Sequence, residues 1–508
     1  MAKLRPEDLA APALDTSTFL RVSLVGLFTI VLVRTAWMHD DAYITLRTVD
    51  NLVSGFGPRW NVSERVQAYT HPLWMVLLAL PYAVTREAYF TPLVLSILVS
   101  AAAMWLFVSR LALSAGAVLV GASVFIFSKA FVEFSTSGLE NPLTHLLLAI
   151  FFTLYWKVEP ARTRILWFVA ALMMLNRLDC GLLVLPPLML RSYEMGWRTG
   201  VKSAAIGLVP LVIWEFFSII YYGSPFPNTA YAKLNTGIGW GPLVMQGLVY
   251  LVNSITHDPV TLFAIAVFVL AAVATRPRDS WPIALGIVLY LIYVVSIGGD
   301  FMSGRFLTAP LFCAVLLMSR FELALKSPLT AGATAAIIAL GVFATNRPPL
   351  LTQDDVLNPP PRTVTIGGVS DERARYYRST GLLRWDRYEP LPDFEWATAG
   401  REARGNPGVV VRADNGMFGY FAGPAVHVVD VLAQGDPLLA RLPALAKWRI
   451  GHFERPVPEG YLETIQSGRN VIADPAIGMK YQRLKTITQE PLWSRRRWRA
   501  IVAMNLSR

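Results

Sequence analysis

Two adjacent carboxylates, Asp40 and Asp41, follow an apolar run and stand in the stretch HDDAYITLR. Because neighbouring carboxylates repel each other, one of them holds its proton more tightly than an isolated Asp does. A carboxylate whose pKa is raised toward neutrality can act as a general base and remove a proton from a hydroxyl group. The alternative is a solvated helix end that is rich in acid. Both readings fit these residues, and either Asp could take the proton.

Further acidic and basic residues recur in short motifs between apolar runs. The motifs STSGLENPL, NRLD, NTAYAKL and GGDFMSGR contain Glu140, Arg177, Asp179, Lys233, Asp300 and Arg305. If these side chains line one water-filled cavity, the Arg and Lys residues would suit a phosphate-bearing substrate. For each Arg the alternative is an ion pair with a neighbouring Asp, or a side chain that extends to the membrane surface.

Several enzyme classes lack their motifs in this sequence. It contains no GxSxG nucleophile turn, no GxxxxGK[ST] phosphate loop and no GxGxxG stretch before a helix. The two cysteines, Cys180 and Cys313, lie in apolar segments and form no CxxC motif. Carboxylate oxygens suit Mg²⁺, Mn²⁺ or Ca²⁺, but no spacing indicates a dedicated metal cage. We therefore expect no certain cofactor and leave a divalent cation open.

The composition is that of a polytopic membrane protein. Of 508 residues, 54% are hydrophobic and only 16% are charged, whereas a soluble domain carries about 25% charged residues. A spanning helix needs about 20 mostly apolar residues. We expect about eleven, at 18–36, 91–110, 115–134, 142–157, 163–177, 179–191, 203–222, 259–275, 281–297, 306–320 and 328–345. The run 73–84 is too short to span and indicates an interfacial or re-entrant segment. The NRLDCG stretch can divide 163–191 into two half-length helices.

The distribution of Lys and Arg orients these helices. Cytoplasmic loops of membrane proteins are enriched in both residue types. With the N-terminus inside, the inside loops hold Arg110, Lys157, Arg162, Arg164, Arg191, Arg198, Lys202, Arg276, Arg278, Arg320 and Lys326. Lys129, near the outer half of the third helix, is the main exception. These loops explain the formal net charge of +11, and since no basic patch is interleaved with exposed aromatics, we expect no nucleic-acid partner.

All the acidic, Gly-rich and aromatic motifs then fall on the outer face. Their aromatic residues fit either an interfacial belt in contact with membrane lipids or sugar stacking. The loop YYGSPFPNTAYAKL contains Gly223, Pro225 and Pro227, so we expect a fixed, non-helical connection there.

The composition changes after about residue 345. We expect a membrane domain over 1–345, with a first outer loop at 37–90, and a Pro-rich linker over 346–370. The more polar remainder, 371–508, contains PGVVVRADNGMFGYFAG, which predicts a strand, a Gly turn and a helix start, and AVHVVDVLA, which predicts a following strand. We expect a small soluble α/β domain there, on the outer face.

Taken together and in this order, the motifs resemble a known family. DDAYITLR, TSGLENPL, RLD, YYGSPFPNTAYAKL, GGDFMSGRFLTAPLF and GHFERPVPEGY are similar to the GT-C glycosyltransferases, and most similar to the AftB-like terminal arabinofuranosyltransferases. The resemblance implies a bacterial inner-membrane, multi-pass enzyme with a GT-C fold. It implies transfer of a pentose, arabinofuranose above all, from a polyprenyl-phosphate donor to a cell-envelope glycan or glycoprotein on the outer face.

The resemblance also implies roles for individual residues. Asp40 or Asp41 would be the general base, with a lean toward Asp40, and Glu140 a second acidic site residue. Arg305, Lys233 and Arg177 would bind the donor phosphate. The remaining substrate-binding positions would be Tyr43, Arg47, Asn228, Tyr231, Asp300, His452 and Arg455.

Two alternatives share much of this pattern. A transporter or flippase for a lipid-linked saccharide would also have a charged, water-filled cavity, but transporters tend to place their key residues near the bilayer midplane. The positions of the charged motifs at helix ends and in outer loops favour an enzyme. A related enzyme could use another polyprenyl-linked sugar, such as mannose.

Overall fold

The structure is a computed structural model, and it describes residues 16–157, 163–275, 279–351, 364–365, 367–384 and 390–506. Of the basic residues predicted for inside loops, Arg162, Arg276 and Arg278 lie outside the described residues, as does part of the linker predicted at 346–370.

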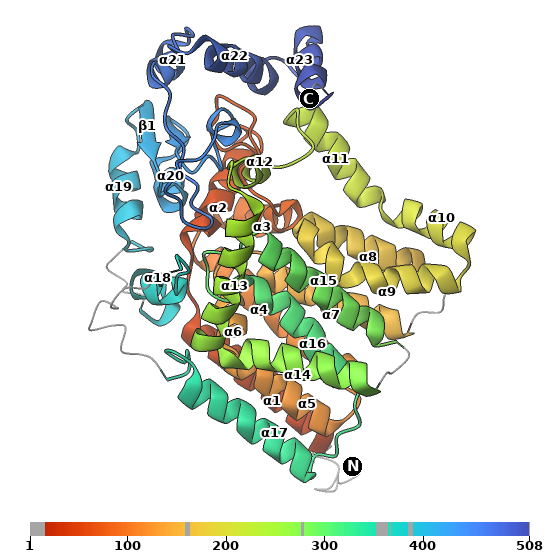
Figure 1. Cartoon of the computed structure of the whole chain (residues 1–508). Helices are drawn as coiled ribbons and strands as arrows, with labels where there is room; N and C mark the ends of the chain where they lie inside the picture. The colour runs from red at the N-terminus through yellow and green to blue at the C-terminus, as the bar shows by residue number, and fades with distance from the viewer. Residues whose placement is uncertain are drawn as a thin grey trace, which may run out of the picture.

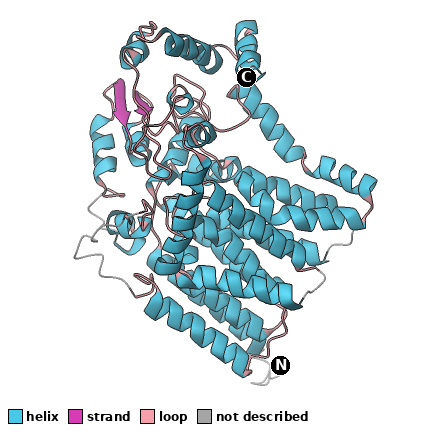
Figure 2. Ribbon diagram, viewed as in Figure 1, coloured by secondary structure: helices cyan, strands magenta, loops and turns pink. Residues whose placement is uncertain are grey.

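The chain up to Ala344 forms a helical bundle (Figures 1 and 2). Its helices are α1 (Thr16–Thr35), α2 (Asp40–Val53), α3 (Pro72–Thr85), α4 (Phe90–Leu106), α5 (Ala115–Phe127), α6 (Lys129–Phe134), α7 (Asn141–Lys157), α8 (Thr163–Asn176), α9 (Gly181–Glu194), α10 (Trp197–Gly207), α11 (Val209–Tyr221), α12 (Asn228–Leu234), α13 (Trp240–His257), α14 (Pro259–Thr275), α15 (Trp281–Ser296), α16 (Thr308–Met318) and α17 (Pro328–Ala339). Single 3-10 or π turns lie at Phe107–Leu111, Leu178–Cys180, Arg305–Leu307 and Leu340–Ala344.

Two helical segments are long and apolar enough to cross a membrane, at Ser17–Thr35 and Phe90–Leu111. Two bent pairs pass the same test when each pair is taken together: α10 with α11, bent by 48°, and α13 with α14, bent by 106°. Most of the other predicted spans are apolar helices of 10–17 residues. Within the described residues the chain is therefore a helical membrane protein, in which two to four spans meet this test rather than eleven.

The segment predicted as one helix at 115–134 is divided at Ser128. The Ser128 hydroxyl accepts the backbone N–H of Phe131 at 3.1 Å and so caps the start of α6. The break also brings Lys129 to Asp371, with 2.8 Å between Nζ and the carboxylate. This ion pair explains why Lys129 does not follow the charge pattern of the loops. The predicted break at NRLDCG is confirmed, since α8 ends at Asn176 and α9 begins at Gly181.

Helix α13 was not predicted from the sequence. Its residues include Gly241, Gln246, Gly247 and Asn253, which lower the hydropathy of the segment. It forms because one face, with Tyr250 and Asn253, is buried against the neighbouring helices while the other is apolar and exposed.

The chain after residue 370 is also mostly helical. It contains α18 (Glu372–Thr380), α19 (Glu395–Ala403), β1 (Gly408–Arg412), α20 (Gly416–Ala422), β2 (Val426–Asp430), α21 (Tyr461–Ser467), α22 (Pro475–Gln489) and α23 (Arg495–Leu506), with 3-10 turns at Leu382–Arg384 and Leu439–Arg441. The two strands pair in parallel, with Val410 opposite Val428. The predicted strand, helix and strand are thus present, but they form the only sheet among the described residues.

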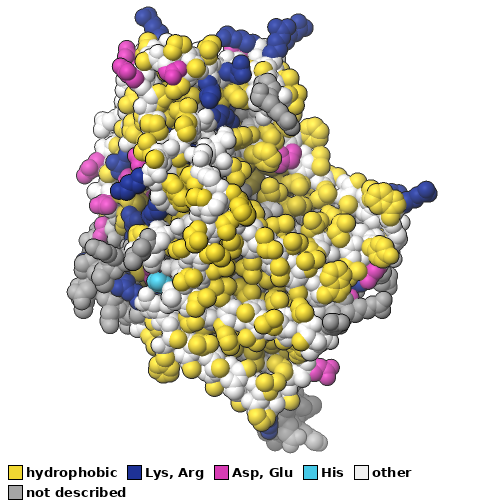
Figure 3. Space-filling model, viewed as in Figure 1, with side chains coloured by type: hydrophobic (Ala, Val, Ile, Leu, Met, Phe, Trp, Pro, Cys, Tyr) yellow, Lys and Arg dark blue, Asp and Glu magenta, His cyan; other side chains and the backbone are white. Residues whose placement is uncertain are grey.

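The hydrophobic core continues from the bundle into this later part of the chain. One cluster of buried side chains includes Phe28 and Phe312 of the bundle together with Tyr376, Met417 and Phe453. The predicted division at 346–370 therefore stays a prediction. Hydrophobic side chains cover the middle of the face in Figure 3, whereas Lys and Arg gather at the end formed by α21–α23, opposite the N-terminus.

Candidate active site

Helix α2 places the two carboxylates in its first turn. His39 is the residue before the helix, and its Nδ1 accepts the backbone N–H of Asp41 at 2.9 Å. The ring is fixed from its other side, where Nε2 lies 3.1 Å from a carboxylate oxygen of Glu372. Acidic side chains at a helix start are stabilised by the helix dipole, which helps to hold two charges in this position.

Asp40 and Asp41 line a cavity of about 270 Å³, together with His452. Segments far apart in the sequence form its walls. Its other lining residues are His39, Phe301, Glu372, Arg375, Tyr376, Trp396, Ala413, Asp414, Asn415, Leu432, Gln434 and Arg449.

Asp40 is buried, with 5% of its surface exposed. Its carboxylate accepts the backbone N–H groups of Gly416 at 3.2 Å and Met417 at 2.6 Å, at the start of α20. Burial raises the pKa of Asp40 to about 7, with a further rise from the charge of Asp41, although these two hydrogen bonds favour the charged form. A carboxylate with a pKa near neutrality is suited to general base catalysis.

Asp41 is the more open of the two, with 26% of its side chain exposed. Its charge acts on Asp300 and on Arg305. Asp41 therefore lies between the cavity and a second group of charged residues.

This second group is centred on Glu140. A Glu140 carboxylate oxygen lies 2.8 Å from Arg305 and 3.3 Å from Arg177, and the other lies 3.4 Å from His71. Burial would raise the pKa of Glu140, but the positive charges of Arg305, His71 and Arg177 lower it to about 2. Glu140 is therefore an anion throughout the physiological range.

Both arginines of this group are already paired with acids. Arg177 also contacts Asp179, at 2.5 Å, and Arg305 contacts Asp300, at 3.5 Å. The structure thus brings together the predicted acidic and basic residues, and it also contains the ion pair of Arg177 with Asp179 that the sequence left as an alternative.

Lys233, by contrast, has no hydrogen bond or ion pair with another residue that the structure describes. Its charge nevertheless influences the group around Glu140. Burial raises the pKa of Asp300, and the positive charges of Arg305 and Lys233 oppose that rise. Lys233 is therefore a cation with unused donors beside the charged group.

Three of the predicted substrate-binding residues lie away from the cavity. Arg47 is buried and donates to the backbone carbonyls of Trp60 and Val426, each at 2.8 Å. Arg455 likewise donates to the carbonyl of Leu442 at 3.0 Å. Tyr43 packs edge-on against Tyr420, where α2 meets α20. In this structure the three side chains hold the fold around the site.

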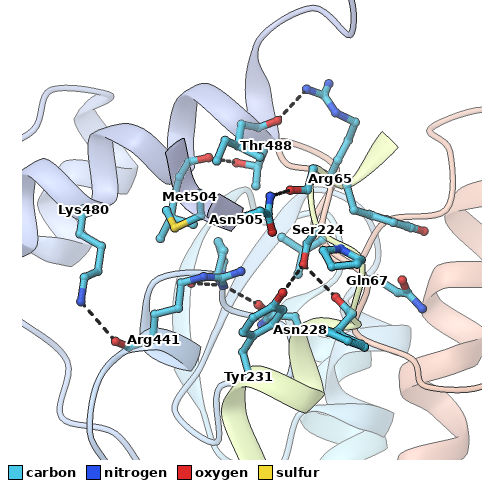
Figure 4. Close-up of a pocket in the computed structure, with 18 of the residues that line it drawn as sticks. Arg65, Gln67, Ser224, Asn228, Tyr231, Arg441, Lys480, Thr488, Met504 and Asn505 are labelled. Atoms are coloured by element: carbon cyan, nitrogen blue, oxygen red, sulfur yellow. Dashed lines mark hydrogen bonds between the residues drawn. The ribbon is translucent and has the colours of Figure 1, made fainter. Parts of the chain in front are cut away.

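Asn228 and Tyr231 line a second, larger cavity of about 720 Å³ (Figure 4). The Asn228 amide donates to the carbonyls of Ala433 and Gln434, at 2.9 and 3.1 Å. Gln434 itself lines the smaller cavity. The segment around 432–437 therefore separates the two cavities.

Several lining residues were missed by the sequence reasoning. Glu372, Arg375 and Tyr376 belong to α18, which begins just after the Pro-rich stretch, and Arg449 lies in the loop before His452. The one available signal was the charged run DERARYYR beside that linker. Among the described residues, no three His, Cys, Asp or Glu side chains converge as metal ligands.

Comparison with known proteins now adds to this geometry. No family model matches the chain. It is 28% identical to the terminal β-(1→2)-arabinofuranosyltransferase of Mycobacterium tuberculosis, over 83% of this chain and 81% of that protein. It is 27% identical to the protein of the same name from Corynebacterium glutamicum, over 86% of this chain and 76% of that protein. The predicted resemblance to the AftB-like arabinofuranosyltransferases is thus confirmed, and it supports a glycosyltransferase.

Proposed function

We propose that this protein transfers arabinofuranose from a polyprenyl-phosphate donor to a cell-envelope glycan, or to a glycoprotein. The names of both relatives support the sugar and the reaction type. The observation that carries the chemical step is Asp40, a buried carboxylate with a pKa of about 7 that lines a cavity beside a cationic cluster.

In the proposed reaction, Asp40 removes the proton from an acceptor hydroxyl group. The electron pair freed on the hydroxyl oxygen forms a bond to the anomeric carbon of the donor sugar, while the bond from that carbon to the phosphate oxygen breaks. Polyprenyl phosphate leaves with the electron pair, and one displacement inverts the anomeric centre. Asp41, next to Asp40 and partly exposed, raises the proton affinity of the base.

Cations near the base would stabilise the phosphate leaving group. Arg305 and Arg177 are paired with Glu140, Asp300 and Asp179, so part of their charge is already balanced. Lys233, which has no ion pair with a described residue, adds a positive charge. Arg375 adds another in the cavity, where it contacts the ring faces of Tyr376 and Trp396 and its charge also acts on Glu372. A cationic environment of this kind lowers the energy of a developing phosphate dianion.

The proposed setting is the outer face of the bacterial inner membrane, with a GT-C fold of about eleven spans. On this view the shorter apolar helices cross the bilayer within the bundle, and the chain after residue 370 lies outside. The Lys and Arg bias of the short loops supports this orientation.

A transfer assay tests the proposal. Purified protein, synthetic polyprenyl-phosphoryl arabinose and an arabinan oligosaccharide should yield an extended glycan. Asp40→Asn should lower kcat about 100-fold or more, the range of a lost general base, while donor binding persists. Asp393→Asn is the matched control, because Asp393 is exposed and lies outside the cavity.

Three results would count against the proposal. Full activity in both Asp40→Asn and Asp41→Asn would remove the base assignment. Movement of intact lipid-linked saccharide without transfer would favour a flippase. Faster transfer from polyprenyl-phosphoryl mannose would assign another donor sugar to the same site.

A further inference from the structure

The larger cavity lies outside the proposed catalytic group and is built from four parts of the chain. They are residues 65–67, the 222–235 loop with α12, the 437–441 turn, and helices α22 and α23 (Figure 4). Its volume of about 720 Å³ is within the range of roughly 300–1,000 Å³ that small-molecule sites occupy.

The charged side chains that line this cavity are all basic. They are Arg65, Arg441 and Lys480, and no Asp or Glu is among the lining residues. The charge of Asp436 does act on Arg441, but the Asp436 carboxylate is buried and accepts the Tyr461 hydroxyl at 2.9 Å. The cavity therefore offers positive charge without an opposing carboxylate on its wall.

Each of these three cations has N–H donors that no described residue accepts. Arg65 donates through Nε and Nη2 to backbone carbonyls of Tyr221, Ile487 and Glu490, and no described residue accepts from its Nη1. Among the described residues, the Arg441 guanidinium donates only through Nη1, to Asn228 and to the carbonyl of Pro437, while it stacks on Tyr231. The ammonium of Lys480 makes one long contact, 3.4 Å to the carbonyl of Arg441.

The rest of the lining suits a saccharide. Hydroxyl and amide groups of Ser224, Tyr231, Thr488 and Asn505 line the cavity, and the Ser224 hydroxyl donates to that of Tyr231 at 2.8 Å (Figure 4). The Thr488 hydroxyl and the Asn505 amide also donate to backbone carbonyls, so they would offer a ligand mainly their oxygens. The ring of Phe226 is about half exposed beside them. Alternating hydrogen-bonding groups and an aromatic face match a sugar better than an acyl chain.

We propose that this cavity binds an anionic saccharide, one that carries a phosphate or carboxylate group, through Arg441, Lys480 and Arg65. The assignment of that saccharide to the acceptor glycan rests on the proposed function. The position fits, because the segment around 432–437 contributes residues to both this cavity and the one that Asp40 lines. A distal anionic group of the acceptor would anchor the glycan here while its reacting end lies near the base.

Equilibrium binding of small probes to the purified full-length chain tests the site directly. Ribose 5-phosphate and glucuronate should bind, and ribose, the neutral probe, should bind at least tenfold more weakly. Arg441→Gln and Lys480→Gln should each weaken binding of the charged probes about tenfold, as loss of one charge-assisted hydrogen bond does. Lys480 is exposed and holds one long contact, so its replacement leaves the fold intact even if that of Arg441 does not.

Two control variants locate the effect. Lys447→Gln removes an exposed cation outside the cavity and should retain probe binding. Arg469→Gln removes a second exposed cation outside the cavity and should also retain probe binding. Equal binding of ribose, or no change in the Arg441 and Lys480 variants, would overturn the proposal.

Two further experiments identify the source of the anion and distinguish binding at this site from the transfer reaction. If the variants lose affinity for nanodiscs of anionic phospholipid while no sugar acid binds, the anion is a lipid headgroup and the saccharide assignment is wrong. In the transfer assay, Lys480→Gln should raise KM for an acceptor that carries the anionic group and not for its neutral analogue. A wild-type protein that binds the probes but transfers nothing would overturn the proposed function and leave this site standing.

Discussion

At the scale of single residues, the proposed function rests on how Asp40 holds its proton. Burial and Asp41 raise its pKa to about 7, and a base works only when deprotonated. Below pH 7, kcat/KM should therefore rise about tenfold per pH unit, and it should level off above. In Asp41→Asn the rising limb of the pH–rate profile should move to lower pH, because the negative charge that raises the pKa of Asp40 has been removed. A pH–rate profile checks both, and a rate that does not change between pH 5 and 8 would contradict them.

Glu140 has a different role, because its charge is balanced by two arginines, Arg305 and Arg177, beside His71. Replacing it with Gln leaves Arg305 and Arg177 buried with too few partners. We expect a loss of about 3–5 kcal/mol in stability, the cost of breaking a buried ion pair. Thermal unfolding in detergent measures the loss. Glu140→Asp should recover part of it, and an unchanged midpoint in Glu140→Gln would show that the network does not stabilise the fold.

Of the three predicted phosphate-binding residues, Lys233 is the one whose charge has no partner within the described part of the chain. If it binds the donor phosphate, Lys233→Met should raise KM for the donor about tenfold, while Lys233→Arg should keep most of the affinity. Lys202→Met, on the exposed surface of α10, is the matched control. A change in kcat alone, with an unaltered KM, would assign Lys233 to the chemical step rather than to binding.

The residue types of the site could be predicted from sequence more easily than their partners. Paired acids and charged motifs between apolar runs identified Asp40, Glu140 and Arg305. Arg47 and Arg455 could not be distinguished from the site residues by sequence, because a buried Arg that donates to backbone carbonyls has the same sequence signal as one that faces a ligand. Arg375 was missed because it reaches the cavity through α18, beyond a linker.

At the scale of elements, the contact between α2 and α20 sets the environment of Asp40. A Cβ added at Gly416 would collide with the backbone of Asp40 and lie 2.8 Å from its carboxyl carbon. Gly416→Ala should therefore push α20 away from α2, at a cost of about 1–3 kcal/mol.

The same substitution should change the pH profile. The displacement of α20 weakens the two backbone hydrogen bonds that favour the charged form of Asp40, so the rising limb of the pH–rate profile should move to higher pH. Gly408→Ala is the control, because nothing lies within 4 Å of a Cβ at that position. Thermal unfolding and the pH–rate profile of both variants test this, and a Gly416→Ala enzyme with a wild-type profile would contradict it.

Elements were predictable where the chain is apolar or strongly patterned. The runs that start near residues 18 and 91 gave α1 and α4, and the short valine-rich runs on either side of a Gly turn and helix start gave β1 and β2. Breaks caused by tertiary contacts were not predictable, as at Ser128, where Lys129 turns toward Asp371. Helix α13 was missed for a similar reason, since its stability comes from the face buried against its neighbours.

At the scale of the whole molecule, orientation in the membrane decides which compartment the cavities face. The loop charges predict that Lys326, between α16 and α17, lies inside, and Arg469, between α21 and α22, belongs to the part of the chain that we expect outside. Both cavities are lined by residues of predicted outer loops and by residues of the chain after residue 370, which is expected on the same face.

Single cysteines at these two positions test the orientation. Both native cysteines are buried and free, so they should contribute little labelling of their own. Lys326 and Arg469 are exposed. In intact cells a membrane-impermeant thiol reagent should label Arg469→Cys, because that side faces outward. Lys326→Cys should be labelled only after permeabilisation. The reverse pattern would place the base and both cavities in the cytoplasm, where the acceptor would have to be a precursor rather than the finished envelope glycan.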